Sequence, residues 1–217
     1  MIPYGLLYRL GFAPWERRDV AESWRPLLEG PHAPAPGRAL DVGCGSGRDA
    51  IYLAKRGWQV TAVDAVEKAV DSAKQRAVEE GVDVQWVAAD VAELSRLGLK
   101  PGYDLLYDFG CIHGLTDAER QGAAAGLTQL AAPGATLLII AFKAGRRIAL
   151  PRGMNQEDVV ALLGDGWDLK DSRSVATEDM PGFLRRVNPT VYRLTRHTQA
   201  PSPGTQTAAT TEDLPSS

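Results

Sequence analysis

Short apolar runs alternate with longer amphipathic stretches between residues 37 and 197. The run at residues 135–142 is apolar over nearly its whole length, as expected for a central strand that is covered on both faces. Residues 66–80 instead place small apolar side chains at helical intervals between charged ones, and Gly81 ends that pattern. The pattern predicts strands at residues 39–42, 58–64, 82–88, 103–108, 135–142, 166–171 and 188–197, and helices at residues 49–56, 66–80, 118–132 and 154–163.

Strands that alternate with helices, followed by two closing strands, are typical of an α/β fold with an open sheet. A chain of 217 residues can bury one good core, whereas a second full domain would be crowded. We therefore expect a single Rossmann-like domain at residues 37–197, with a seven-stranded, mostly parallel sheet and helices on both faces. Residues 1–36 form an aromatic and proline-rich segment ahead of it, and the composition of residues 198–217 predicts a disordered tail.

The first 24 residues hold five of the fifteen aromatic side chains of the chain. Two interpretations remain open for this segment. It forms a helix that packs its aromatic residues onto the main domain, or it forms a lid over a bound ligand. In the second case Tyr8 and Phe12 would contact a substrate. The five aromatic residues are Tyr4, Tyr8, Phe12, Trp15 and Trp24.

Composition narrows the classes of partner. The net charge is −3 and the sequence contains no block of lysine and arginine, which argues against nucleic acid as the main partner. No apolar run reaches membrane-spanning length and no signal peptide is evident, so we expect a cytoplasmic protein without membrane contact. Two cysteines do not make a disulfide framework, and Cys44, Cys111 and His113 are too few for a metal site.

Three glycines separate the first predicted strand from the helix that follows it. Read from Gly45 onward, the spacing is compatible with the dinucleotide fingerprint and does not by itself exclude NAD. Asp41 argues against NAD, because a carboxylate at the end of this strand would repel a pyrophosphate. S-adenosylmethionine carries an ammonium and a sulfonium and no phosphate, so an acid there favours it.

The pattern Asp41-x-Gly43-x-Gly45-x-Gly47 resembles the first motif of class I S-adenosylmethionine-dependent methyltransferases. The resemblance implies an antiparallel seventh strand between the fifth and the sixth. It also implies a cofactor site at the carboxyl ends of the strands. Pro14-Trp15 resembles a Pro-Trp pair near the start of thiol, halide and thiopurine methyltransferases. In those enzymes the tryptophan lies near the methionine end of the cofactor. The cofactor-binding residues expected on these grounds are Asp41, Gly43, Cys44, Gly45, Gly47, Asp64, Ala65, Asp90, Val91, Asp108 and Trp15.

Two of these acids have alternative explanations. Asp64 follows Gly43 by about the twenty residues at which a carboxylate reaches ribose hydroxyls, but it also precedes a helix whose dipole favours an acid. The resemblance gives Asp90 a hydrogen bond to the adenine amino group, with Val91 beside the ring. The alternative is that Asp90 caps a short helix at residues 91–97.

The loop at residues 109–115 would face the methyl acceptor. The segment at residues 108–113 resembles the corresponding segment of small bacterial methyltransferases of the thiopurine, thiol and tellurite-resistance type. One position departs from that pattern, because Phe109 stands where thiopurine methyltransferases often have arginine. His113 is the candidate base for a phenol acceptor, and a buried structural histidine is the alternative. Phe109, Cys111 and His113 would line the acceptor side.

These observations predict methyl transfer to sulfur or oxygen of a small molecule by a monomer or homodimer. Two alternatives remain. One is an NAD-dependent oxidoreductase. The other is a protein that binds S-adenosylmethionine and has lost catalysis.

Overall fold

The computed structural model describes residues 26–30, 33–145, 151–175 and 187–198. One sheet runs through the domain in the strand order β3-β2-β1-β4-β5-β7-β6. All neighbouring pairs are parallel except β5 with β7 and β6 with β7, which are antiparallel. The strands are β1 (Arg38–Val42), β2 (Gln59–Asp64), β3 (Gln85–Ala88), β4 (Tyr103–Phe109), β5 (Ala131–Phe142), β6 (Trp167–Ser174) and β7 (Pro189–Arg196).

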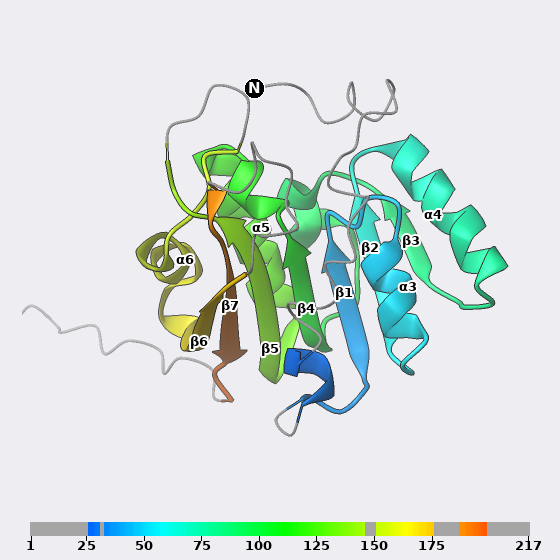
Figure 1. Ribbon diagram of the computed structural model, residues 1–217, viewed down its shortest axis with the longest axis horizontal. Helices are drawn as coiled ribbons and strands as arrows, with labels where there is room; N and C mark the ends of the chain where they lie inside the picture. Colours follow the sequence, from blue (N-terminus) through cyan, green and yellow to red (C-terminus); the bar gives the residue numbers. More distant parts are fainter. Residues whose placement is uncertain (1–25, 31–32, 146–150, 176–186, 199–217) are drawn as a thin grey trace, which may run out of the picture.

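Helices cover both faces of this sheet (Figure 1). One apolar core lies between the sheet and the side that carries α5 and α6, and it includes Leu40 and Leu106. The other core lies on the side of α3 and includes Ala39 and Leu105. Figure 1 shows α4 beside the β3 edge and α6 beside the β6 edge. Among the described residues, 26–29 are helical. The helices that follow them are α3 (Arg48–Ala54), α4 (Glu67–Glu79), α5 (Asp117–Leu130) and α6 (Gln156–Leu163), with the 3-10 helices η2 (Val91–Arg96), η3 (Ile112–Gly114) and η4 (Gly164–Gly166).

The predicted fold class is therefore confirmed, including the antiparallel strand between the fifth and the sixth. The strand order reverses between β1 and β4, because β2 follows β1 on one side of this pair and β5 follows β4 on the other side. Ligands of open α/β sheets bind outside the carboxyl ends of the strands at such a point. In the paired register Asp41 lies next to Tyr107, and Val42 lies next to Asp108. The sheet thus brings acids of two distant segments to one edge.

Several predicted boundaries were wrong, and two of them have a clear physical reason. The third strand begins at Gln85 rather than at residue 82, because the Val82 N–H donates to Ala77 O and closes the end of α4 instead of joining the sheet. The helix expected at residues 118–132 ends at Leu130, and β5 already begins at Ala131. Backbone ahead of a proline avoids the helical region, so Pro133 favours extended residues before it.

In the described part of the chain, none of the helices combines the length and the apolar character that a membrane span requires.

Candidate active site

A tight turn joins β1 to α3. Gly43 and Gly47 both have positive φ, at 74° and 77°, a region that residues with a Cβ rarely adopt. Both glycines also lie in close packing. A Cβ on Gly43 would lie 2.4 Å from the Cβ of Cys111, and one on Gly47 would lie 2.4 Å from Cη2 of Trp86. The turn therefore requires glycine for its backbone conformation, as predicted, and also for its packing against Cys111 and Trp86, which the sequence did not predict.

Replacing Gly47 by alanine should lower the free energy of unfolding by about 1–3 kcal/mol more than replacing Gly98. Both glycines have positive φ, so alanine strains the backbone at each, but nothing lies within 4 Å of a Cβ on Gly98. The difference between the two variants isolates the overlap with Trp86 and Ala73. Urea unfolding of Gly47→Ala and Gly98→Ala measures it, and equal losses would contradict this account.

Asp64 ends β2 and anchors the glycine turn. Its Oδ2 accepts a hydrogen bond of 2.8 Å from the Gly45 N–H, and its Oδ1 accepts one of 2.8 Å from the Val66 N–H. The side chain is half-buried, and Ala65 beside it is exposed. Carboxylate oxygens are acceptors with about four lone-pair positions, and ribose hydroxyls are suitable donors to them. Ribose binding by Asp64 stays a prediction that this geometry permits.

Asp41 is a buried acid, only 2% exposed. Among the described residues, its Oδ2 has no hydrogen-bond partner. Burial raises the pKa of this carboxyl well above its ordinary value, and three neighbouring acids raise it further while Arg48 opposes them. A bound cation would offset that cost, because opposite charge favours the ionised acid. The three acids are Asp49, Asp64 and Asp108.

A charged pair at the start of α3 lies beside this acid, and sequence reasoning missed it. Asp49 accepts a hydrogen bond of 3.2 Å from the buried Tyr107 hydroxyl and forms an ion pair with Arg48. The Arg48 guanidinium lies 5.9 Å from the centre of the Phe109 ring. The available signal was Asp49 in the first helical turn, where the helix dipole favours an acid.

Asp90 caps η2, as the structural alternative predicted. Its side chain accepts a hydrogen bond of 2.9 Å from the Ala92 N–H, and the residue is otherwise exposed. Val91 is buried behind it, 4% exposed. The cap and the adenine contact do not exclude each other, since the bond to Ala92 involves only Oδ1. The adenine contact stays a prediction.

Asp108 shapes the loop that follows β4. Its Oδ1 accepts from the N–H groups of Cys111, at 2.8 Å, and Ile112, at 3.2 Å. Its Oδ2 is buried without a hydrogen-bond partner among the described residues. Burial raises the pKa of this carboxyl to about 7, although the two backbone hydrogen bonds and Arg120 lower it. Asp108 thus holds the loop and leaves one carboxyl oxygen unengaged.

Both cysteines line the turn as neutral thiols. Burial raises the pKa of Cys44 and of Cys111, and the neighbouring acids raise both further. A thiol that stays protonated is a poor nucleophile. Cys111 packs against Gly43, and its place in the wall on the acceptor side stays a prediction.

His113 lies in η3 and is 3% exposed. Its Nδ1 accepts a hydrogen bond of 3.0 Å from the Phe142 N–H, and its ring packs against the Phe142 ring at 4.6 Å between centroids. A backbone N–H can only donate, so the proton of the neutral ring is on Nε2. This geometry favours the structural alternative for His113. A role as base stays a prediction, and it would require the ring to change its tautomer.

Arg120 is a buried cation on α5 that sequence reasoning missed. Its Nε donates to Ile112 O at 3.2 Å, and its Nη2 donates to His113 O and, at 3.1 Å, to Gly153 O. It therefore joins the loop after β4 to the loop before α6. An arginine on an amphipathic helix gives no local signal that separates it from a solvated charge.

The structure brings most of the predicted site residues to the carboxyl edge around β1, β2 and β4. Asp41, the glycine turn, Asp64 and Asp108 meet there. Phe109 is the last residue of β4, and Cys111 and His113 follow it. Asp90 and Val91 follow the adjacent β3. Tyr8, Phe12 and Trp15 lie outside the described residues.

Residues 39–134 match a family model described as a methyltransferase domain. The 2-heptyl-1-hydroxyquinolin-4(1H)-one methyltransferase of Mycobacteroides abscessus is 29% identical over 139 residues, which are 62% of this chain and 60% of that protein. Nodulation protein S of Rhizobium tropici is 32% identical over 158 residues, which are 72% of this chain and 63% of that protein. The chain thus spans about six tenths of the length of these two relatives.

The structure of a 1,6-didemethyltoxoflavin-N1-methyltransferase from Burkholderia thailandensis resembles this one with a TM-score of 0.71 at 23% identity. The match covers 90% of this chain and 86% of that one, which holds 1,6-didemethyltoxoflavin and S-adenosylhomocysteine. A likeness at this identity establishes the fold. Taken with the glycine turn and its acids, the family match and these relatives show that the chain is similar to class I S-adenosylmethionine-dependent methyltransferases.

Proposed function

We propose that this protein transfers a methyl group from S-adenosylmethionine to sulfur or oxygen of a small molecule. The observation that carries the cofactor part of the proposal is the buried Oδ2 of Asp41 beside the glycine turn, which has no hydrogen-bond partner in the described part of the chain. Three further acids lie close enough to raise the pKa of Asp41. Such a concentration of negative charge suits a cationic ligand and opposes a pyrophosphate. An NAD-dependent reaction is therefore not favoured.

The residues around the turn fit the parts of this cofactor. Asp41 would face the ammonium group, and Asp64 would accept hydrogen bonds from the ribose hydroxyls. The glycine turn allows a ligand to approach the backbone, which a side chain at Gly43 or Gly47 would obstruct. Asp90 and Val91 would hold the adenine. The bound cofactor supplies an electrophilic methyl group.

The protein's own part in such a transfer is mainly positioning. In-line displacement needs the attacking atom at near-attack distance from the methyl carbon and a site from which water is excluded. The loop held by Asp108 and Arg120 forms the wall on the acceptor side. A thiolate or phenolate acceptor would arrive ionised and need no base, in keeping with the hydrogen bond that Nδ1 of His113 already accepts.

Calorimetry and a methyl-transfer screen test the proposal. S-adenosylhomocysteine should bind in calorimetry and NAD should not, because only NAD brings a pyrophosphate to Asp41. With methyl-labelled cofactor, label should pass to members of a panel of thiols and phenols. Binding of NAD with no binding of S-adenosylhomocysteine would refute the proposal. Binding without transfer would indicate the inactive alternative, and transfer only to amines would move the acceptor atom to nitrogen.

A further inference from the structure

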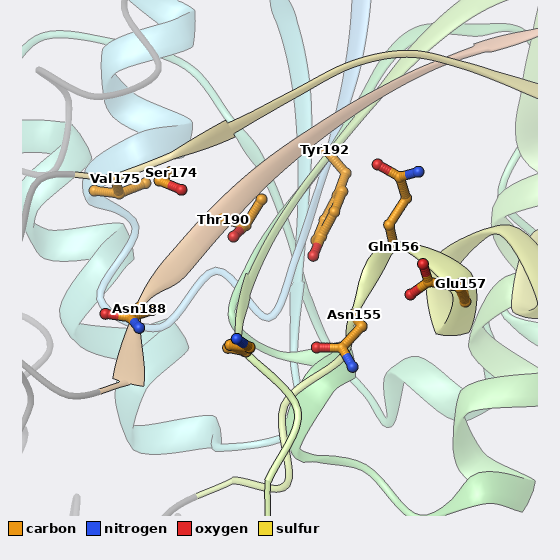
Figure 2. Close-up of a pocket in the computed structure, with 9 residues that line it drawn as sticks. Asn155, Gln156, Glu157, Ser174, Val175, Asn188, Thr190 and Tyr192 are labelled. Carbon is orange, nitrogen blue, oxygen red and sulfur yellow. The ribbon is translucent and has the colours of Figure 1, made fainter.

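A polar hollow of about 620 Å³ opens beside the ends of β5 and β6 and the start of β7 (Figure 2). One wall is the beginning of α6, and the other is formed by the two antiparallel strands. Ser174 and Thr190 are paired neighbours across β6 and β7, so their hydroxyl groups belong to one wall. The residues that line the hollow are Lys143, Asn155, Gln156, Glu157, Ser174, Val175, Asn188, Thr190 and Tyr192.

The lining is unusual for a site that binds apolar molecules. Six of its nine side chains are uncharged and polar, one is apolar, and the two charges, on Lys143 and Glu157, are opposite in sign. Sites for drug-like ligands are lined mostly by apolar and aromatic side chains with only a few polar groups. This hollow has the reverse composition, which suits a neutral ligand that is rich in hydroxyl groups.

Several of these side chains are held in place by the structure around them. Asn155 Oδ1 accepts a hydrogen bond of 3.0 Å from the Ala144 N–H, and Gln156 Oε1 accepts one of 3.2 Å from the Ser172 hydroxyl. The Tyr192 hydroxyl donates to Met154 O at 3.3 Å. Polar groups that are already ordered lose less entropy when a ligand binds.

The backbone after β5 and the side chain of Arg120 connect the wall of the hollow to the acceptor side of the candidate active site. Phe142 donates its N–H to His113, and the next residue, Lys143, lines the hollow. Arg120 connects the carbonyls of His113 and Gly153, and Asn155 of the lining follows Gly153 by two residues. The acceptor loop and the wall of the hollow are therefore held by the same side chain.

The distance between the hollow and the β1 turn determines which part of an acceptor the hollow can bind. Adjacent strands lie about 4.8 Å apart, and β7 is three strands away from β1 in the sheet, a separation of roughly 14 Å. A group bound at the start of β7 is too far from the β1 turn to react there itself. A molecule that fills the hollow and is also methylated must extend along the edge of the sheet.

We propose that the hollow binds the neutral, hydroxyl-rich body of an elongated acceptor, as a sugar ring would provide, while the reacting group extends to the end of β4. This inference rests on the proposed function, since it assigns the substrate class of the same enzyme. It adds that acceptors with a polar body are preferred over compact aromatic ones.

A matched pair of phenols tests the inference: 4-hydroxyphenyl β-D-glucoside, with a sugar ring, and hydroquinone, without one. The KM of the glucoside should be at least roughly 5-fold lower than that of hydroquinone, the effect of about one hydrogen bond. The double variant Ser174→Ala, Thr190→Val should remove this preference and leave kcat with hydroquinone unchanged. Equal KM values in the native protein, or a preference that survives in the double variant, would overturn the inference.

Thr195→Val is the matched control, because Thr195 lies on the same strand but five residues away, outside the lining. It should keep the preference. Saturation-transfer NMR with S-adenosylhomocysteine-saturated protein gives a readout that does not depend on turnover. Sugar protons should be saturated in the native protein and not in the double variant, and no saturation in the native protein would overturn the inference. Failure of the proposed function shows separately, as absent calorimetric binding of S-adenosylhomocysteine.

Discussion

Replacing Asp64 by alanine should weaken the binding of S-adenosylhomocysteine by roughly 100-fold or more. Two contributions are lost together. Hydrogen bonds from ribose hydroxyls to a carboxylate are each worth about 1.5–3 kcal/mol, and 2.7 kcal/mol corresponds to about 100-fold in affinity. The carboxylate also accepts from the Gly45 N–H at 2.8 Å, so its removal frees the turn that the cofactor must approach. Calorimetric titration of the variant measures the loss.

Asp71→Ala is the control for charge alone. Asp71 lies on α4 in an exposed pair with Lys74, and its removal should leave the affinity unchanged. Thermal unfolding of the unliganded Asp64→Ala variant reports whether the fold persists. A folded variant that binds S-adenosylhomocysteine with native affinity would mean that ribose recognition lies elsewhere in the chain.

Replacing Asp108 by asparagine should change how stability depends on pH. The pKa of Asp108 is raised to about 7 in the folded protein, above its ordinary value of 3.8. Between those values the folded state binds more protons than the unfolded state, so stability falls as the pH rises from 4 towards 7. A rise of about three pKa units corresponds to about 4 kcal/mol. Asparagine does not titrate, and its side-chain oxygen can still accept from Cys111 and Ile112.

Urea unfolding of the native protein and of Asp108→Asn at pH 4, 6 and 8 measures this effect. Relative to the native protein, the variant should gain stability by about 4 kcal/mol between pH 4 and pH 8. Comparing the change with pH, rather than stability at one pH, removes the constant cost of the buried amide. Asp83→Asn, at an exposed position, should show no such gain. A constant difference between native protein and Asp108→Asn across this range would contradict the assignment.

Much of the fold could be predicted from local sequence because local patterns record burial directly. The apolar run that became β5 and the spaced small residues of α4 reflect which faces are covered. Strand order is different, since it depends on partners far apart, such as Ile139 with Tyr192. The position of β7 came from family resemblance, which the structure confirmed, and not from periodicity.

The candidate site likewise contains residues that local sequence predicts and residues whose roles depend on contacts between distant segments. The glycine turn and the acids that end the strands are encoded within short segments, and their positions were predicted. Arg120 and Tyr107 were missed because their roles arise from tertiary contact. Arg120 meets a carbonyl 33 residues away, and Tyr107 meets Asp49 across 58 residues. Neither side chain carries a local sign of burial, because arginine on a helix and tyrosine on a strand are both common.

The hydrogen bond from the Phe142 N–H to His113 affects how the rate of methyl transfer depends on pH. While its Nδ1 accepts a hydrogen bond from the backbone and its Nε2 carries the proton, the imidazole of His113 has no free lone pair with which to deprotonate an alcohol or a phenol. The pH–rate profile would then be set by each acceptor's own acid dissociation. Its inflection would shift between acceptors of different acidity while the protein stays the same.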